Sequence, residues 1–195
     1  MLSEKCKVAD FVSGGGTNLQ AILDSRGEII KNAEICLVAS NNKDAYALER
    51  AKKHDIETFI IEDEQRLVEK LKSLEIDFIV LAGYLRILSE EFCKRYSNRI
   101  INVHPSLIPS FCGKGFYGLK VHEKALEYGV KVSGATVHFV NEIPDGGKII
   151  DQKAVRVHEG DTAEDLQKRV MADAEHIILP QAVENVAIMI KNGEI

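Results

Sequence analysis

Short apolar runs alternate with helix-period stretches through the first half of this chain. The apolar runs occupy residues 8–12, 34–40, 57–61, 78–82 and 100–104. Helices are expected in the connections, starting at residue 17 and covering about 45–51, 64–74 and 89–96. Apolar strands that alternate with helices are typical of a parallel sheet covered on both faces. The first half of the chain therefore predicts a doubly wound α/β fold.

The second half of the chain follows a different pattern. Residues 105–119 contain proline and glycine, and this connection is long enough to favour a binding loop or lid. Two apolar segments, 132–140 and 148–157, are joined by the turn sequence Pro144-Asp145-Gly146-Gly147. Because so short a connection cannot cross over, the two segments are expected to form an antiparallel pair.

The last part of the chain predicts a long helix. Thr162 followed by Asp165 is a capping box that starts it, Gly193 ends it, and Pro180 predicts a kink inside it. No internal repeat or linker interrupts residues 1–195, which are expected to form a single domain. The predicted fold class is α/β and doubly wound, with a mainly parallel sheet, antiparallel C-terminal strands and a long C-terminal helix.

The composition is that of an ordinary globular protein, with 45% hydrophobic and 28% charged residues. A net charge of −5 argues against a nucleic-acid partner but allows a local phosphate pocket. The apolar runs are too short to span a bilayer, so no membrane association is expected. The four cysteines are scattered and no signal-peptide pattern is present, which favours a reduced, cytoplasmic setting. No cluster has metal-ligand spacing, so no metal is expected.

A glycine-rich loop, Ser13-Gly14-Gly15-Gly16-Thr17-Asn18, lies between the first strand and the first helix. Glycines let a backbone approach a phosphate closely, and a helix N-terminus supplies free N–H groups and positive potential. The loop is neither a Walker A motif nor a GxGxxG fingerprint. It is interpreted as an anion site, and the alternative is a plain tight turn.

Asn102 and His104 stand at the end of the strand 100–104, and Pro105 stops that strand. Ligands of open α/β sheets bind beyond the carboxyl ends of the strands, and strand alternation puts these two side chains on the same side. An amide and an imidazole can therefore converge on one reacting atom. The alternative is that both side chains only satisfy local backbone groups.

Other polar residues have simpler interpretations from the sequence alone. Asp145 is favoured in a turn because its side chain bonds to turn backbone. His138, in an apolar segment, is interpreted as a satisfied core residue, whereas His122 and His158 are interpreted as surface residues. No serine or cysteine lies on a recognisable nucleophile elbow, which disfavours covalent catalysis.

Taken together, these motifs resemble the phosphoribosylglycinamide formyltransferases, a branch of the folate-dependent formyltransferase family. The segments that carry the resemblance are 13–18, 39–44, 82–88, 102–107, 135–140 and 145–147. The resemblance implies an enzyme of purine biosynthesis that transfers the formyl group of 10-formyltetrahydrofolate to the amine of glycinamide ribonucleotide. The implied partners are these small molecules, and the oligomeric state stays open, with a homodimer among the options.

The resemblance also assigns residues to roles. Asn102, His104 and Asp145 match the catalytic trio, which replaces the turn-only interpretation of Asp145. The matches to ribonucleotide-binding positions are Gly15, Gly16, Thr17, Asn18 and Glu175. The matches to folate-binding positions are Leu85, Arg86, Ile87, Leu88, Asn102, Ile143, Pro144 and Asp145. Residues 1–104 would form a nucleotide-phosphate-binding half, and residues 105–195 a folate-binding and catalytic half.

The trio suggests a direct transfer without an acyl-enzyme. Asn102 can donate an amide N–H to the developing oxyanion, and protonated His104 can act as a general acid. The Asp145 carboxylate is expected to favour the imidazolium by raising the pKa of His104.

Two segments depart from the family pattern. The loop 110–119 differs from the shorter version of some members, so none of its residues is assigned a role. The segment 60–66 aligns poorly, which leaves Arg66 as a candidate for the contact with the folate glutamate tail.

Two kinds of alternative remain. A sibling enzyme would be a formyltetrahydrofolate hydrolase, expected to carry an N-terminal regulatory domain, or a methionyl-tRNA formyltransferase, expected to carry a basic C-terminal domain. This sequence predicts neither domain. A non-catalytic nucleotide-binding module would need the glycine loop but not the trio together.

Overall fold

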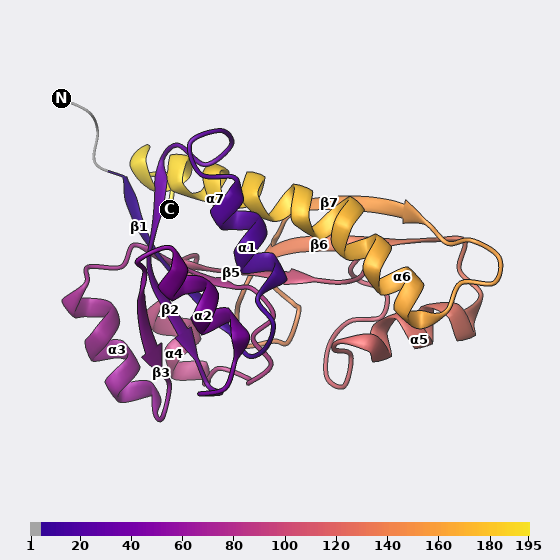
Figure 1. The fold of residues 1–195 in the computed structure, drawn as a ribbon, viewed down its shortest axis with the longest axis horizontal. Coiled ribbons are helices and arrows are strands. Elements are labelled where there is room, and N and C mark those ends of the chain that lie inside the picture. Colours follow the sequence, from indigo (N-terminus) through magenta and orange to yellow (C-terminus); the bar gives the residue numbers. More distant parts are fainter. Residues whose placement is uncertain (1–4) are drawn as a thin grey trace.

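The computed structural model describes residues 5–195, and these contain one seven-stranded sheet (Figure 1). The strands are β1 (Cys6–Val12), β2 (Ala33–Ser40), β3 (Glu57–Ile60), β4 (Phe78–Leu81), β5 (Ile100–His104), β6 (Val132–Phe139) and β7 (Ile149–Arg156). Their order in the sheet is β3-β2-β1-β4-β5-β6-β7. The pairs from β3 through β5 are parallel, whereas β6 pairs antiparallel with both β5 and β7. The predicted fold class is confirmed.

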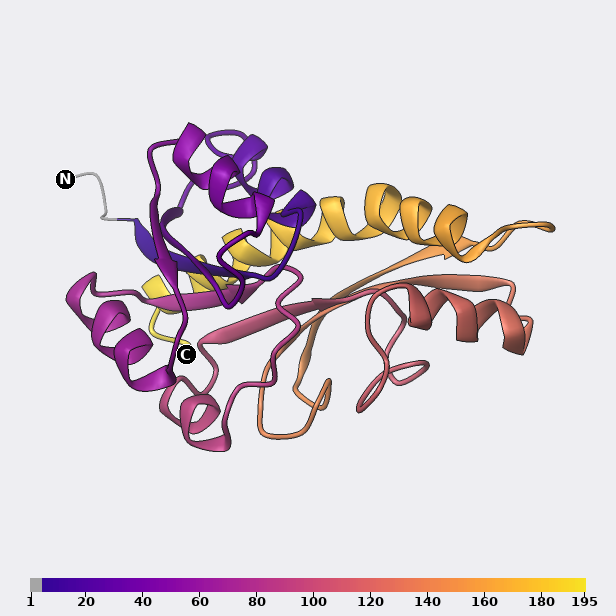
Figure 2. The same cartoon turned by 60° about the horizontal axis from the view of Figure 1, so that its bottom comes forward.

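Helices cover both faces of the sheet, as Figure 2 shows. They are α1 (Thr17–Asp24), α2 (Tyr46–Lys53), α3 (Glu64–Ser73), α4 (Glu90–Arg95), α5 (Leu119–Tyr128), α6 (Ala163–Val170) and α7 (His176–Lys191). Between α6 and α7 lies a π-helical turn, η1 (Met171–Glu175). Helices α1, α2 and α7 lie on one face, and α3 and α4 lie on the other.

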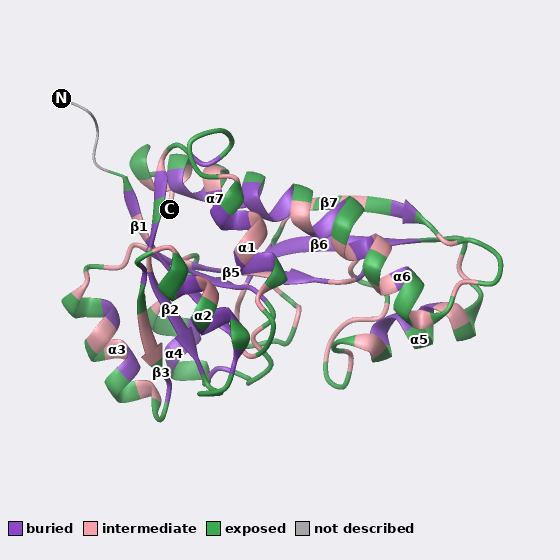
Figure 3. Ribbon diagram, in the orientation of Figure 1, coloured by how far each residue is buried: buried purple, intermediate pink, exposed green. Residues whose placement is uncertain are grey.

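Two apolar clusters flank the sheet, and most of the strands between them are buried (Figure 3). Alternate residues of β1 point to opposite sides, so Val8 and Val12 pack beneath α1 and α7 while Ala9 and Phe11 pack against α3 and α4. Strands β1 and β4 are buried along almost their whole length, as expected for central strands of a doubly wound sheet.

The C-terminal helix begins as predicted and then departs from regularity. Thr162 and Asp165 form the capping box, with each side chain paired to the other residue's backbone N–H. No break in helical structure occurs at Pro180, which lies inside α7. The irregular element is η1, which ends at Glu175, directly before His176. Because Pro180 has no N–H group, the carbonyl of His176 lacks its usual helical hydrogen-bond donor. The kink predicted at Pro180 stays a prediction, and the irregular turn that the structure shows lies before α7.

No helix within residues 5–195 is long and apolar enough to cross a membrane. Over the same residues, no group of three or more His, Cys, Asp or Glu side chains is arranged to hold a metal ion.

Candidate active site

A cavity of about 480 Å³ opens at the carboxyl ends of β1, β4 and β5. The strand order reverses between β1 and β4, which is where doubly wound sheets bind their ligands. The cavity is lined by every residue matched to a catalytic, ribonucleotide-binding or folate-binding position: Gly15, Gly16, Thr17, Asn18, Leu85, Arg86, Ile87, Leu88, Asn102, His104, Ile143, Pro144, Asp145 and Glu175. Segments far apart in sequence are therefore brought to one place.

The glycine loop closes one end of the cavity. Gly16 takes the N-cap position of α1 in the left-handed conformation, with φ 71°, and no side chain caps this helix. The first backbone N–H groups of α1 are consequently left for a ligand, where the helix dipole favours an anion. A Cβ on Gly16 would lie 2.6 Å from the Cβ of Ala47 in α2, so only glycine fits there.

A buried polar pair lies behind this loop. The side-chain amide of Asn18 donates to the Glu175 carboxylate over 2.7 Å. Both side chains are buried, and Oδ1 of Asn18 has no partner within the described residues. Burial raises the pKa of Glu175, although the hydrogen bond from Asn18 opposes that rise. Glu175 ends η1, so the π-helical turn fixes where this carboxyl group lies.

Asn102 and His138 face each other across β5 and β6, where they are paired in the strand register. The Asn102 Nδ2 atom lies 3.2 Å from Nε2 of His138. An amide NH₂ group has two hydrogens, so Asn102 keeps one free for a ligand. His138 is buried as predicted, but it is also part of the cavity wall and contacts the trio.

His104 lies at the end of β5 and is almost fully buried. Its Nδ1 atom is 3.5 Å from Oδ2 of Asp145, and its Nε2 atom is 2.9 Å from the Phe111 carbonyl oxygen. Burial lowers the pKa of His104, and the nearby Asp145 carboxylate only partly offsets this. The expected upward effect of Asp145 is present, but burial outweighs it, so the net shift is downward.

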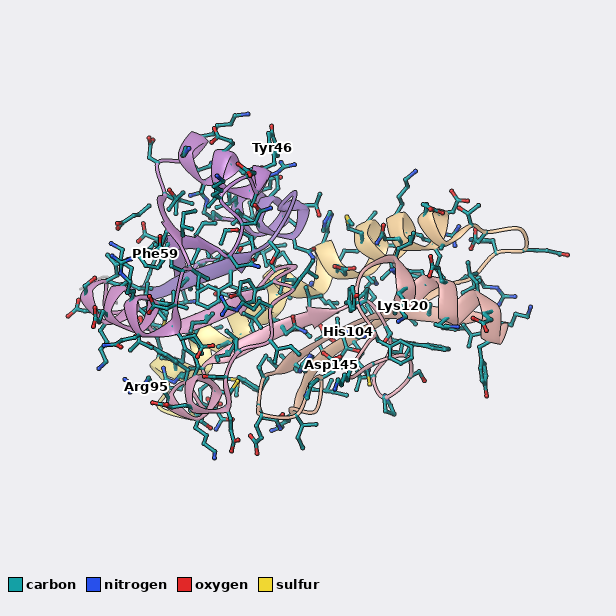
Figure 4. All side chains as sticks on the ribbon, turned by 90° about the horizontal axis from the view of Figure 1, so that it is seen from below. Tyr46, Phe59, Arg95, His104, Lys120 and Asp145 are labelled. Carbon is teal, nitrogen blue, oxygen red and sulfur yellow. The ribbon has the colours of Figure 1, made fainter. Side chains whose placement is uncertain are left out.

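Asp145 is more than a turn residue. It takes the left-handed conformation with φ 56°, in a turn closed by the Gly146 N–H donating to Ile143 O at 2.9 Å. Its Oδ2 atom accepts the Gly113 N–H at 2.8 Å, and its Oδ1 atom lies 3.6 Å from Nε2 of His138. Figure 4 shows Asp145 close to His104 in the middle of the molecule.

The electrostatics of Asp145 follow from these partners. Its burial would raise the pKa of the carboxyl group. The nearby rings of His138 and His104 and the hydrogen bond from the Gly113 N–H together outweigh burial, so the pKa of Asp145 is lowered. The carboxylate is thus kept ionised between two imidazole rings.

The carbonyl partners of the two imidazole rings fix where each ring carries its hydrogen. Nε2 of His104 faces the Phe111 carbonyl, and Nδ1 of His138 faces the Phe139 carbonyl at 2.8 Å. Since a carbonyl only accepts, each of these nitrogens carries the hydrogen. The opposite nitrogen, which faces Asp145, can donate only when its ring is cationic. Protonation of His104 is therefore tied to the ionised state of Asp145.

His122 was predicted to be a surface residue, and this prediction is wrong. It projects inward from α5, is fully buried, and lines the same cavity. Neither ring nitrogen has a partner within residues 5–195. Burial, followed by the charge of His104, lowers the pKa of His122 to about 4. By contrast, His158 is exposed, as predicted.

The other end of the cavity is apolar and open. Leu85, Ile87 and Ile143 are 64%, 74% and 60% exposed at its mouth. The backbone N–H of Leu85 donates to the Ser13 hydroxyl at 2.9 Å, which ties this segment to the glycine loop. Arg66 does not line the cavity and instead pairs with Glu62 on the exposed side of α3.

The loop before α5 also belongs to the site, in line with the binding loop expected for residues 105–119, although none of its residues was assigned a role. Residues 113–118 line the cavity. Phe111, just before them, supplies the carbonyl that bonds to His104, and Gly113 supplies the N–H that bonds to Asp145. The loop thus completes the surroundings of both catalytic candidates.

Comparison with known proteins shows to which family this chain belongs. Residues 6–183 match the formyl transferase family, and the chain belongs to that family. A curated relative, the chloroplastic phosphoribosylglycinamide formyltransferase of Arabidopsis thaliana, is 40% identical over 91% of this chain. The solved phosphoribosylglycinamide formyltransferase of Anaplasma phagocytophilum has a TM-score of 0.88 at 37% identity, covering 95% of this chain and 88% of that one. Within the family, these similarities point to the phosphoribosylglycinamide formyltransferase branch.

Two further comparisons concern the length of a relative and the fold of another enzyme branch. The chain spans 64% of the length of the Arabidopsis relative. A formyltetrahydrofolate deformylase from Pseudomonas syringae shares the fold with a TM-score of 0.84 at 28% identity, covering 95% of this chain and 62% of that one. The fold is therefore common to both branches, and the site has to distinguish them.

Proposed function

We propose that this chain transfers the formyl group of 10-formyltetrahydrofolate to the amine of glycinamide ribonucleotide, a step of purine biosynthesis. The products are formylglycinamide ribonucleotide and tetrahydrofolate. The observation that carries this proposal is one cavity that joins the glycine loop and the uncapped start of α1 to Asn102, His104 and Asp145. A hydrolase would need the trio, but it has no use for a phosphate site on the acceptor side.

The two substrates fit the two ends of the cavity. The phosphate would lie on the free N–H groups at the start of α1, and Glu175 with Asn18 would receive the ribose hydroxyls. The flat, largely apolar pterin would lie against Leu85 to Leu88 and the turn 143–145. In this assignment residues 1–104 supply the phosphate loop together with Asn102 and His104, and residues 105–195 supply Asp145 and Glu175, so both halves contribute to the cavity.

The chemistry follows from what the trio can donate. The substrate amine forms a bond to the formyl carbon, and negative charge develops on the formyl oxygen. The free hydrogen of the Asn102 amide donates to that oxygen, and one such donor is worth about 3 kcal/mol of barrier in other enzymes. As the charge develops, protonated His104 becomes more favourable, and the Asp145 carboxylate stabilises it.

His104 needs access to the formyl oxygen for this role. Its Nε2–H group donates to the carbonyl of Phe111, while Nδ1 faces Asp145. We propose that the formyl oxygen takes the place of the Phe111 carbonyl when the loop 105–118 adjusts to substrate. The bond from carbon to the folate nitrogen then breaks, and the proton lost by the amine reaches that nitrogen along the His104 and Asp145 route.

The proposal is tested by mixing the purified chain with both substrates and following tetrahydrofolate formation by absorbance. We expect turnover to require glycinamide ribonucleotide and to yield formylated amine rather than formate. Rapid formation of formate without the ribonucleotide would establish a hydrolase instead. Binding of the ribonucleotide with no turnover at all would leave only a nucleotide-binding module.

A further inference from the structure

The glycine loop is held from behind through its carbonyl groups. Three successive carbonyls, which all face α2 and the segment before it, each accept a hydrogen bond. The pairs are Asn42 Nδ2 to Ser13 O at 3.4 Å, Ala47 N to Gly14 O at 3.1 Å, and Arg50 Nε to Gly15 O at 2.8 Å. The last of these is the shortest, and it comes from a permanently charged donor.

These bonds fix the direction of the opposite backbone groups. In a planar trans peptide, the C=O of one residue and the N–H of the next point in opposite directions. When the carbonyls of Ser13, Gly14 and Gly15 face α2, the N–H groups of Gly14, Gly15 and Gly16 must face away from it. Those three N–H groups have no hydrogen-bond partner among residues 5–195, and the three glycines line the cavity. The loop is thus a row of donors directed at a ligand.

Arg50 joins this loop to the helix that follows it. While Nε bonds to Gly15, Nη1 donates to Oε1 of Gln20 in α1 at 2.9 Å. The guanidinium carbon also lies 5.1 Å from the centre of the Tyr46 ring, and this cation–π contact stabilises the position of the Arg50 side chain. The planar guanidinium group of Arg50 therefore holds the Gly15 carbonyl in a fixed position relative to the first turn of α1.

Two independent features agree that the loop is built for a ligand. Gly16 approaches Ala47 so closely that the loop has no room to shift towards α2. On the cavity side, Asn18 is only 8% exposed, and its Oδ1 atom has no partner within the described chain. That buried acceptor beside the row of donors matches a ligand that carries both an anion and hydroxyl groups.

We propose that Arg50 is a positioning residue for the phosphate of the substrate. It acts through the Gly15 carbonyl, holding the N–H groups of the loop in the direction that a phosphate needs. This inference rests on the proposed function for the identity of the full substrate, but the phosphate contact itself can be measured separately.

The variants are Arg50→Ala and Arg50→Lys, with Lys53→Ala as the matched control. Lys53 is on the same helix and lies 5.7 Å from the same Tyr46 ring, but it makes no contact with the loop. Its removal costs the same unit of charge, so the control isolates the hydrogen bonds from the general potential. Inorganic phosphate is titrated into each full-length protein, and the ¹⁵N–¹H amide signals of Gly14 to Gly16 report binding.

We expect Arg50→Ala to weaken phosphate binding about tenfold or more, since a charge-assisted hydrogen bond is lost. Arg50→Lys should fall between Arg50→Ala and the wild type, because an ammonium group cannot span both acceptors as the fork does. Lys53→Ala should stay within about twofold of the wild type, as expected for a screened surface charge. In turnover, Arg50→Ala should raise KM for the ribonucleotide while its activity on the phosphate-free riboside stays at the wild-type level.

The outcomes separate the two proposals. Equal losses in Arg50→Ala and Lys53→Ala, or no phosphate-dependent shifts of the loop amides in the wild type, would overturn the role of Arg50. If phosphate binding depends on Arg50 but glycinamide ribonucleotide is not formylated, the positioning role stands and the proposed function fails.

Discussion

Asn18 in the first turn of α1 donates a 2.7 Å hydrogen bond to Glu175, a residue 157 positions further along the chain. This contact joins the glycine loop to the end of the π-helical turn, so the two ends of the sequence build one wall of the cavity. A buried carboxyl group with a single hydrogen-bonding partner is costly in folding free energy. We therefore expect Glu175 to form a further hydrogen bond with a ligand.

Replacement of Glu175 by Gln tests whether this carboxyl group binds the ligand. The shape is kept, and the burial cost of a carboxylate is removed, so the melting temperature should equal or exceed that of the wild type. The affinity for glycinamide ribonucleotide should fall about tenfold, because the charged acceptor for the ribose hydroxyls is lost. Calorimetric titration and thermal unfolding measure both effects. A variant that lost stability but kept its affinity would mark Glu175 as purely structural.

Gly15 and Gly16 should respond differently to alanine. A Cβ on Gly15 meets nothing within 4 Å, whereas one on Gly16 meets Ala47 at 2.6 Å in a backbone with φ 71°. Gly16→Ala should therefore lose roughly 1–3 kcal/mol of unfolding free energy from the left-handed conformation alone. Gly15→Ala should unfold like the wild type but bind the ribonucleotide more weakly. Urea denaturation and titration of the two variants compare these effects, and equal unfolding curves would contradict the packing around Gly16.

The sequence predicted the elements well because their signals are local. The apolar run 100–104 coincides with β5, and the capping box at Thr162 starts α6 as expected. The turn-only alternative for Asp145 fails because its partners, His104 and Gly113, come from distant segments. Here the family resemblance supplied what local turn chemistry could not.

What the sequence missed depends on contacts between elements. His138 has the pattern of a core residue, and only the antiparallel register with Asn102 brings it to the site. The residue pattern of α5 does not reveal that His122 lies on the buried face of this helix. The sequence predicted an irregularity at Pro180, but it did not predict the π-helical turn η1 (Met171–Glu175).

His122 should make the stability of the protein depend on pH. Its pKa in the folded protein is about 4, below the ordinary 6.5, so the unfolded chain binds more protons between these values. The wild type should therefore lose stability as the pH falls from 6.5 towards 4. His122→Leu, of similar volume, should change stability by less than about 1.5 kcal/mol at pH 7.5 and should flatten that acid slope. Denaturant melts across this range measure the difference, and parallel slopes would show that the pKa of His122 is the same in the folded and unfolded states.

His104 and Asp145 should act as one unit in turnover. Asp145→Asn keeps the shape of the side chain but removes its charge, so activity near neutral pH should fall severely and what remains should shift towards acid. His104→Ala should be at least as impaired. The double variant should be little worse than His104→Ala, since residues that act together are non-additive. Steady-state pH profiles of the three variants provide the comparison, and fully additive losses would mean that the two residues work separately.

The most direct test is an NMR titration of the His104 ring in the wild type and in Asp145→Asn. In the wild type, burial already lowers the pKa of His104, and the carboxylate 3.5 Å from Nδ1 limits that fall. Removal of the charge leaves burial unopposed, so the pKa of His104 should drop further in Asp145→Asn. An unchanged or higher pKa would contradict the electrostatic support that Asp145 is assigned in formyl transfer.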